Sequence, residues 1–389
     1  MTVAQTPTKR PTTETTRFRR LGIVTAAVAV LALTAPAAVS AAPAPAGAPG
    51  TVVSVETLPA DAQLVGAHDS ERLTYWTEGP TGGPALSTGA VYVPDGPSPA
   101  GGWPVVSWAH GTTGVADACA PSHGEISDFA RTYLGTWLAQ GFAVVASDFV
   151  GLGTDGTHAY LHGRSEGRAV IDMVRAARAV TPELSPTWVA VGHSQGGHAA
   201  MFAAHEATRY APELDYRGAV ATGTPANLED LFPLGGPGFP NLGLSGLPAF
   251  AAYVVDGLRV ARPDIRVDDY LTPVGAGLVR RSEQLCFTEL LAEAGDVGVG
   301  EMLSRPLGDD TFRTAIREYL SVPTTGYDRP LFVGHGLPDT TVPYPLGAKL
   351  AADLALNGQN VTFRTYPGTH RVSALESLPD VTAFVRALI

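Results

Sequence analysis

Short apolar runs recur along the chain, and most of them end at a glycine, a proline or a polar residue. Residues 88–93 (TGAVYV) alternate before Pro94, whereas residues 103–111 (WPVVSWAHG) form a nearly continuous apolar run that closes on glycine. Continuous runs of this length are typical of strands that are buried on both faces. The predicted strands are 88–93, 103–111, 142–148, 187–194, 217–224, 329–336 and a more polar strand at 360–367.

Stretches with a helical spacing of apolar residues separate these strands. Strands that alternate with helices predict an α/β fold, in which a mostly parallel sheet carries helices on both faces. The predicted helices are 127–140, 166–179, 195–208, 346–357 and 373–388.

Residues 227–328 interrupt this alternation. The segment begins with a stretch rich in proline, glycine and leucine (231–250), and pieces with helical spacing follow it. About 100 residues without a core strand are too many for an ordinary loop. A helical cap inserted between two late core strands is the simplest account, and a separate accessory domain is the alternative. The helical pieces lie near 249–260, 283–294 and 309–320.

The N-terminus predicts a secretion signal. Five basic residues and one acid precede the apolar run Leu21–Ala35, and the small residues VSA follow it at 39–41. This order is that of a secretory signal, and the apolar run is shorter than the about 20 residues that a transmembrane helix needs. Arg19 and Arg20 leave open whether export follows the general or the twin-arginine route. We therefore expect a secreted, extracellular protein without stable membrane insertion.

The predicted organisation divides the chain into five parts. They are a signal peptide at 1–41, a flexible leader at 42–50, the first part of the α/β core at 51–226, the cap at 227–328 and the second part of the core at 329–389.

Composition and charge exclude two classes of protein. With 45% hydrophobic residues, the chain has enough apolar material for a large core, so it is neither disordered nor fibrous. The formal net charge is −11, from 26 Lys and Arg against 37 Asp and Glu. This balance argues against nucleic acid as a partner, because phosphate binding needs clustered Lys and Arg.

The two cysteines, Cys119 and Cys286, are too few for a disulfide scaffold or a cysteine-rich metal site. An exported chain leaves the reducing cytoplasm, so one disulfide between them is the expected state. Two unconnected buried thiols are the alternative.

The sequence GHSQG (192–196) carries the central candidate chemistry. It matches G-x-S-x-G in the required context, with a strand before it (TWVAV) and a helix after it (HAAMFAAHEA). A serine in such a turn stands at the carboxyl edge of the sheet, next to a helix N-terminus that favours negative charge. We therefore assign Ser194 as the nucleophile, and a glycine-rich turn with a buried serine is the alternative.

An H-G turn follows an earlier strand, in the sequence HGTTG (110–114). A turn of this kind commonly supplies one of the two backbone donors of an oxyanion hole. Acyl transfer needs two such donors because the carbonyl oxygen becomes an anion. We assign them to the backbone N–H groups of Thr112 and Gln195, and we expect His110 to be structural.

A candidate acid and a candidate base follow the last two predicted strands. Asp339 lies in a turn just past the earlier strand, and His370 lies between the last strand and a helix. The chain order Ser194, Asp339, His370 is that of α/β-hydrolases. We interpret Asp328 and Asp353 as solvated surface groups.

The remaining histidines have weaker claims to a catalytic role. His193 and His198 flank the nucleophile and are expected to line the site or to pack, and His335 lies at a strand end. There is no metal-ligand spacing such as H-E-x-x-H, so we expect neither a metal nor a cofactor. The others are His205 on a helix and the loop residues His68, His123, His158 and His162.

These assignments define a mechanism. A serine hydroxyl is a poor nucleophile at neutral pH, so His370 takes its proton as general base and passes it to the leaving alcohol. Asp339 fixes the imidazole tautomer and stabilises the imidazolium. An acyl-enzyme forms on Ser194, and water hydrolyses it by the reverse sequence.

Together, these motifs resemble those of the secretory lipase family of the α/β-hydrolase superfamily. The resemblance rests on HGTTG, CAPS, SDFVGLG, GHSQGG, PDTTVP and GTH, and it runs from about residue 55 to the end. It implies an extracellular serine ester hydrolase that acts on acylglycerols or simpler carboxylic esters, with a helical cap and a disulfide at the two cysteines. The family's nucleophile, acid and base fall on Ser194, Asp339 and His370. We interpret Asp148 and the GLG turn as shaping a loop beside the pocket.

The substrate remains open at this point. The segment 231–258 is apolar apart from Asp256, and it either lines an acyl tunnel at a lipid–water interface or forms the buried face of cap helices. A serine aminopeptidase on the same fold would need acids to hold the substrate amine, for which Glu229, Asp230 and Asp256 are candidates. An acyltransferase would share the triad, whereas a non-catalytic binding protein would normally lose one of its members.

Overall fold

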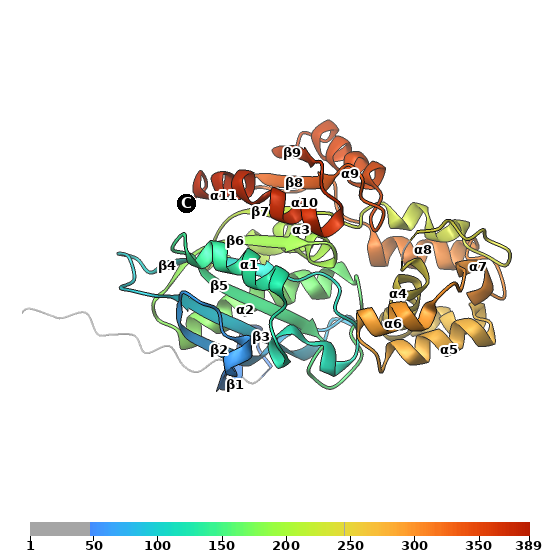
Figure 1. The fold of residues 1–389 in the computed structure, drawn as a ribbon, viewed down its shortest axis with the longest axis horizontal. Coiled ribbons are helices and arrows are strands. Elements are labelled where there is room, and N and C mark those ends of the chain that lie inside the picture. The colour runs from blue at the N-terminus through green and yellow to red at the C-terminus, as the bar shows by residue number, and fades with distance from the viewer. Residues whose placement is uncertain (1–46, 245) are drawn as a thin grey trace, which may run out of the picture. The chain divides into compact units, whose positions relative to one another are not determined.

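The computed structural model describes residues 47–244 and 246–389, which Figure 1 shows coloured along the chain. The predicted signal peptide at 1–41 lies outside the described residues, as do residues 42–46 of the predicted leader. In the described part of the chain, no helix has both the length and the apolar character needed to cross a lipid bilayer.

A nine-stranded sheet forms the centre of the described structure, in the order β1-β2-β3-β5-β4-β6-β7-β8-β9. The first three pairs are antiparallel, and every pair from β5 to β9 is parallel. The mostly parallel sheet predicted from the sequence is therefore confirmed. The strands are β1 (Val52–Thr57), β2 (Ala67–Glu78), β3 (Pro84–Pro94), β4 (Trp103–Ala109), β5 (Ala143–Val150), β6 (Leu184–His193), β7 (Asp215–Thr222), β8 (Leu331–Gly336) and β9 (Val361–Tyr366).

The seven predicted strands correspond to β3–β9, but the sequence does not predict β1 and β2. The buried residues of β2, such as Leu73 and Tyr75, alternate with partly exposed ones. An antiparallel strand near the edge of a sheet has one solvated face. It therefore lacks the continuous apolar run by which the central strands are recognised.

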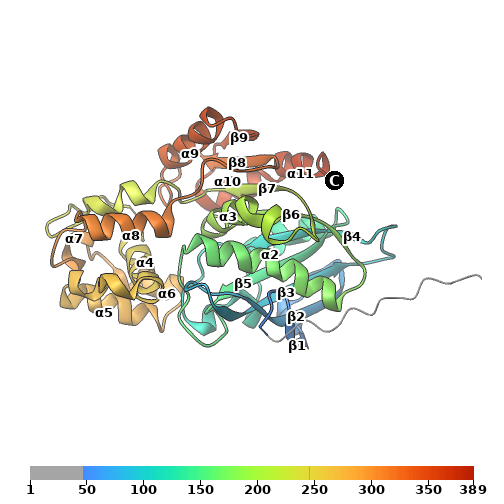
Figure 2. The same cartoon turned by 180° about the vertical axis from the view of Figure 1, so that it is seen from behind.

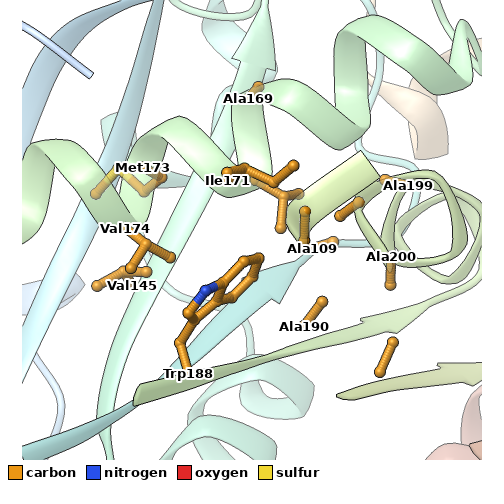
Figure 3. Close-up of a cluster of buried hydrophobic side chains, with 14 of the residues drawn as sticks. Ala109, Val145, Ala169, Ile171, Met173, Val174, Trp188, Ala190, Ala199 and Ala200 are labelled. Carbon is orange, nitrogen blue, oxygen red and sulfur yellow. The ribbon is translucent and has the colours of Figure 1, made fainter. Parts of the chain in front are cut away.

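Helices cover both faces of the sheet, as predicted. Val144 and Val145, which are neighbours on β5, belong to two different hydrophobic clusters, one on each face. In Figure 3, Trp188 of the sheet lies beside Val174 of α2, and Figure 2 shows α2 and α3 in front of the strands. One face carries α2 (Gly163–Val180), α3 (Gln195–Tyr210) and α9 (Tyr344–Leu356), and the other carries α1 (Asp128–Leu138), α10 (His370–Glu376) and α11 (Leu378–Arg386).

The prediction of one helix over 373–388 is wrong. The structure divides this stretch into α10 and α11, and α10 begins three residues earlier, at His370. The break falls at Ser377, whose hydroxyl donates to the carbonyl of Ala374. Pro379 follows two residues later, and proline both lacks an N–H and restricts the residue before it. The consequence is that His370 lies in the first turn of a short helix of its own.

In the described residues between β7 and β8 there are helices and loops but no strand; we call residues 227–328 the cap segment. Its buried side chains, among them Tyr253, Leu290 and Phe312, form a hydrophobic cluster of their own. The helix predicted at 283–294 starts only after its N-cap, Cys286, and the sequence does not predict α5. The α-helices are α4 (Leu247–Ala261), α5 (Pro273–Ser282), α6 (Phe287–Ala294), α7 (Val299–Met302) and α8 (Asp310–Leu320).

A disulfide and a short backbone pairing join the cap segment to the core. The disulfide links Cys119 to Cys286, whose Cα atoms are 5.4 Å apart, and the predicted pair is confirmed. Gly114 and Cys286 form an antiparallel β-bridge, and the N–H of Phe287 donates to the carbonyl of Thr113 at 2.8 Å. The start of α6 is therefore attached directly to the loop that follows β4.

Candidate active site

Ser194 lies in a tight turn between β6 and α3. Its backbone angles are φ 58° and ψ −124°, in a region that non-glycine residues rarely adopt. The turn requires glycine on both sides. A Cβ on Gly192 would overlap the carbonyl oxygen of Gly196, and a Cβ on Gly196 would overlap that of Ala109. The G-x-S-x-G spacing therefore produces a strained turn that presents the serine at the carboxyl edge of the sheet.

His370 connects Ser194 to Asp339. Its Nε2 lies 2.8 Å from Oγ of Ser194, and its Nδ1 lies 2.6 Å from Oδ2 of Asp339. A carboxylate oxygen accepts hydrogen bonds, so Nδ1 donates to Asp339 and Nε2 accepts from the serine hydroxyl. The serine and the histidine are 176 positions apart in the chain. They meet because β6, β8 and β9 are parallel and end at the same edge of the sheet.

The backbone of its own loop holds Asp339 in place. Its Oδ1 accepts the N–H groups of Thr341 and Val342, each at 2.9 Å, which leaves Oδ2 for His370. The side chain of Asp339 is 0% exposed, whereas that of His370 is 15% exposed. The acid is therefore screened from water, while the imidazole remains accessible from the site.

Two further histidines lie beside the three residues as neutral groups. Burial and the nearby His370 lower the pKa of His193 well below its ordinary value, and the two ring centroids are 4.6 Å apart. Burial also lowers the pKa of His335, whose Nε2 donates to the carbonyl of Val342 at 2.8 Å and lies 3.5 Å from Oδ2 of Asp339. The sequence indicates a place at the site for His193 but only a strand end for His335. The sequence feature that could have placed His335 at the site is its position four residues before Asp339.

Thr112 and Gln195, the predicted oxyanion residues, both belong to segments that border Ser194. Gln195 is the first residue of α3, and N–H groups in the first turn of a helix have no acceptor within the helix. A Cβ on Gly111 would lie 3.5 Å from Cβ of Ser194, so the loop after β4 passes directly beside the serine. His110 orders this loop, because its Nδ1 donates to the carbonyl of Gly111 at 2.7 Å.

Ser194 and His370 line a cavity of about 410 Å³. Most of its walls are apolar: Phe129 comes from α1, while Phe250 and Phe287 come from the cap segment. Thr112 also lines this cavity, next to the serine. A bound molecule would therefore lie between core and cap residues, with its reacting atoms at the carboxyl edge of the sheet.

The apolar segment 231–258 divides between the two roles considered for it. Phe250 borders the cavity. Tyr253 and Leu258 are instead fully buried in the hydrophobic cluster of the cap segment, and Leu242 is exposed. Most of this segment therefore stabilises the cap segment, and a small part of it shapes the cavity.

Asp148 fixes a loop that forms one wall of the cavity. Its Oδ1 accepts the N–H of Ser122 at 3.0 Å, and its Oδ2 accepts the hydroxyls of Thr88, at 2.8 Å, and of Ser122. Both Asp148 and Ser122 line the cavity. These contacts agree with the interpretation of Asp148 as a residue that shapes the pocket.

The three acids considered for an aminopeptidase lie elsewhere in the described structure. Asp256 pairs with Arg259 at 2.9 Å, and Glu229 and Asp230 line a second cavity of about 370 Å³ together with Arg317. None of the three borders the cavity at the serine. Among the described residues, no group of three or more His, Cys, Asp or Glu side chains is arranged to hold a metal ion.

Comparison with known proteins adds a family to this geometry. The sequence pattern of the secretory lipase family matches residues 127–386. Lipase A of Moesziomyces aphidis is 28% identical over 364 residues, covering 84% of this chain and 73% of that protein. Secreted triacylglycerol lipase LIP7 of Malassezia globosa is 28% identical over 274 residues, covering 66% of this chain and 56% of the relative. The crystal structure of Candida antarctica lipase A in its closed state has a TM-score of 0.72 at 23% identity, covering 87% of this chain and 82% of that one, and this likeness shows the α/β-hydrolase fold. The match to the family pattern spans more than half of the chain, and the chain therefore belongs to the secretory lipase family.

Proposed function

We propose that this protein is a secreted serine ester hydrolase, which cleaves acylglycerols or simpler carboxylic esters through an acyl-enzyme on Ser194. The observation that carries the proposal is the hydrogen-bonded line from Ser194 through His370 to Asp339 at the wall of an apolar cavity. Membership of the secretory lipase family supports the reaction class, which is the hydrolysis of carboxylic esters.

In the first half of the reaction, Nε2 of His370 takes the hydroxyl proton of Ser194 while Oγ attacks the ester carbonyl. The carbonyl oxygen becomes an anion and accepts hydrogen bonds from the backbone N–H groups of Thr112 and Gln195. The ester C–O bond then breaks, the imidazolium gives its proton to the leaving alcohol, and the acyl group stays on Ser194. Throughout, Asp339 holds the proton on Nδ1 in place and stabilises the imidazolium.

In the second half, water replaces the alcohol. His370 takes a proton from the water as its oxygen attacks the acyl carbon, and the same two N–H groups stabilise the second oxyanion. Ser194 leaves with the proton from His370, and the carboxylic acid is released. No step requires a metal ion or an organic cofactor.

The cavity supports an ester with one modest hydrocarbon chain as the substrate. Its volume of about 410 Å³ lies near the lower end of the about 300–1,000 Å³ that is typical of small-molecule sites. Its aromatic and aliphatic walls favour a hydrocarbon over a charged group. Since Phe250 and Phe287 belong to the cap segment, we expect that segment to contribute to the choice of acyl chain and to contact with lipid.

Three observations support secretion. The N-terminal residues carry the predicted signal, the family is the secretory lipase family, and the two cysteines form a disulfide, which persists in oxidising compartments. The aminopeptidase alternative has no corresponding support, because its candidate acids do not border the cavity in the described structure. An acyltransferase would use the same residues and would differ in excluding water from the acyl-enzyme.

The first test is the Ser194→Ala variant, measured with p-nitrophenyl butyrate. We expect it to abolish hydrolysis with an unchanged melting temperature, and we expect a fluorophosphonate probe to label Ser194 in the wild-type protein. Ser98→Ala, at an exposed loop position, is the matched control and should retain both activity and labelling. Turnover by Ser194→Ala would remove that residue from the role of nucleophile.

The second test is a series of acyl chains from acetate to palmitate, with and without an emulsified interface. Short and medium chains should be hydrolysed fastest in solution, because the cavity is small. Activity confined to long chains at an interface would instead identify a lipase that needs a surface. Transfer of the acyl group to an added alcohol in preference to water would identify an acyltransferase.

A further inference from the structure

A short segment contacts the side chains of both residues assigned to the oxyanion hole. This segment, residues 158–166, leads into the first turn of α2; we call it the support segment. The hydroxyl of Tyr160 lies 2.7 Å from Oγ1 of Thr112. The Nε2 atom of Gln195 lies 2.8 Å from Oε1 of Glu166. Thr112 follows β4 and Gln195 opens α3, so one segment reaches two residues that are distant in the chain.

The contact with Gln195 uses both hydrogens of its side-chain amide. One hydrogen goes to Oε1 of Glu166. His158 donates from Nδ1 to the carbonyl of Val150 at 2.9 Å, so its Nε2 has a free lone pair and accepts the second hydrogen at 2.8 Å. With both hydrogens taken, the side chain of Gln195 has one orientation, which restrains the backbone of the same residue.

Glu166 is a buried group with only 1% of its surface exposed. Burial raises the pKa of its carboxyl, but the neighbouring imidazoles of His198 and His158 and the amide of Gln195 hold that pKa below its ordinary value. Its Oε1 also accepts the N–H of Leu161 at 2.9 Å. An ionised carboxylate is a stronger acceptor than a neutral amide, and it lies directly behind the first residue of α3.

Tyr160 connects the support segment to the cap segment as well as to Thr112. Burial raises the pKa of its phenol, which therefore stays protonated and remains a hydrogen-bond donor. The carbonyl of Tyr160 accepts the hydroxyl of Tyr319, on α8, at 2.8 Å. The support segment is therefore held from the core through Glu166 and from the cap segment through Tyr319.

We infer that the support segment sets the spacing of the two oxyanion donors, with Tyr160 and Glu166 as positioning residues that act through Thr112 and Gln195. Such donors must lie about 2.7–3.1 Å from the developing oxyanion. A displacement of about 0.5 Å is enough to lose a productive geometry. The inference rests on the proposed function, because the oxyanion forms only if the site transfers an acyl group.

The test compares two variants that each change one polar group. Tyr160→Phe removes only the hydroxyl, and Glu166→Gln keeps the shape but weakens the acceptor. We expect kcat for p-nitrophenyl butyrate to fall about tenfold in the first and about 10–100-fold in the second, less than the about 10²–10³ that follows loss of a whole donor. KM should change by less than about twofold, because the oxyanion is absent from the ground state.

Two matched controls remove the same groups away from the site. Tyr327→Phe deletes a hydroxyl that donates to the carbonyl of Pro323 at 2.7 Å. Asp172→Asn neutralises a fully buried carboxylate on the same helix as Glu166. Both controls should lower the melting temperature and leave kcat unchanged at a temperature where they are folded. Equal kcat losses in controls and test variants would overturn the inference.

A double-mutant cycle separates positioning from a merely structural role. Thr112→Val keeps the backbone donor but removes the hydroxyl that Tyr160 contacts. If Tyr160 acts through that hydroxyl, Tyr160→Phe should lower kcat little further in the Thr112→Val background, whereas independent structural effects would multiply. A trifluoromethyl ketone, which forms a tetrahedral oxyanion on the serine, should lose affinity in proportion to kcat in each variant. Unchanged ketone affinity in Tyr160→Phe would contradict the inference.

The inference and the proposed function fail in different ways. If the wild-type protein hydrolyses no ester, or if Ser194→Ala retains turnover, the proposed function is wrong and the inference falls with it. If the wild-type protein is active and Tyr160→Phe matches Tyr327→Phe in kcat, only the inference is wrong. The Tyr160 and Thr112 variants decide the matter even if Glu166→Gln does not fold.

Discussion

The carboxyl edge of the sheet and the cap segment are constrained in different ways. At the edge, backbone atoms approach so closely that neither Gly192 nor Gly196 has room for a Cβ. In the cap segment, Gly277 on α5 has only the end of the Arg280 side chain near its Cβ position, at 3.9 Å. The edge depends on backbone contacts at the turn that holds Ser194. The buried side chains of the cap segment instead form a hydrophobic cluster of their own, although Gly275 on α5 also lies against backbone. The edge therefore fixes the positions of the reacting atoms, whereas the cap segment shapes the space around them.

The largest effect on kcat should come from the residues proposed as base and acid at the carboxyl edge of the sheet. His370→Ala and Asp339→Asn should each lower kcat by about 10³–10⁴-fold, because the first removes the base and the second changes its tautomer. Steady-state hydrolysis of p-nitrophenyl butyrate measures both. Asp328→Asn, at an exposed carboxylate, is the control. A larger loss of kcat in this control than in Asp339→Asn would show that the acid is misassigned.

Replacing a glycine with alanine should destabilise the fold at the carboxyl edge but stabilise it in the cap segment. Gly192→Ala inserts a Cβ into the carbonyl of Gly196, so we expect it to abolish activity and to destabilise the fold by several kcal/mol, about the upper range for single substitutions. Gly277→Ala replaces glycine inside a helix and should stabilise the protein by about 0.5–1 kcal/mol. Thermal and urea unfolding of both variants measure the contrast. A stable, active Gly192→Ala protein would show that the edge is not determined by backbone geometry.

Removing the covalent link between the two regions should cost stability. The double variant Cys119→Ser with Cys286→Ser should be less stable by about 2–4 kcal/mol, because a long loop is no longer closed in the unfolded chain. Thermal unfolding gives the difference, and the mass of the unreduced wild-type protein reports the bond. Two free thiols in that mass spectrum would reject the disulfide.

Changes to the cap wall of the cavity should alter the choice of substrate more than the rate of chemistry. Phe287→Ala enlarges the cavity, so the preferred acyl chain should become longer while kcat for the butyrate ester changes by less than about tenfold. The acyl-chain series measures this shift. Leu242→Ala, at an exposed position of the cap segment, should leave the profile unchanged. An unchanged profile in Phe287→Ala would mean that the cap segment does not select the chain.

The smallest effect concerns the pH dependence of the cap segment. Burial raises the pKa of Asp256 to about 7, the negative charge of Glu283 adds to this, and Arg259 opposes it. A carboxyl whose folded pKa is raised stabilises the fold fully below the unfolded pKa of about 4. That contribution is lost as the pH rises through about 7. Melting temperatures should therefore fall more between pH 5 and pH 8 for the wild-type protein than for Asp256→Asn, and parallel curves would contradict this sign.

Local backbone requirements made several parts of the fold predictable from sequence. The continuous apolar runs predict the central strands β4 to β8, because strands buried on both faces tolerate few polar side chains. An alternating pattern predicts β3, and a more polar one predicts β9. The glycines of GHSQG predict the turn at Ser194, because that turn leaves no room for a Cβ. Ser194, Asp339 and His370 each follow a strand of the parallel part of the sheet. Because these strands end at one edge, the three residues are expected to meet there.

Other features could not be predicted from the sequence, because they depend on contacts between segments that are distant in the chain. The position of His335 beside Asp339 depends on how the loop after β8 turns back. The contacts of the support segment with Thr112 and Gln195 join residues 48 and 29 positions apart. The residues around each member of these pairs show no sequence pattern that predicts the contact.

The amino-acid sequence was therefore enough to predict which candidate catalytic residues follow each central strand and where the backbone needs glycine. Three features became visible only in the folded protein. They are the side chains that meet, the part of the apolar segment 231–258 that faces the cavity, and the separate short helix that begins at His370. Backbone sterics act over a few residues and can be recognised locally, whereas side-chain contacts between distant segments form only after the whole chain has packed.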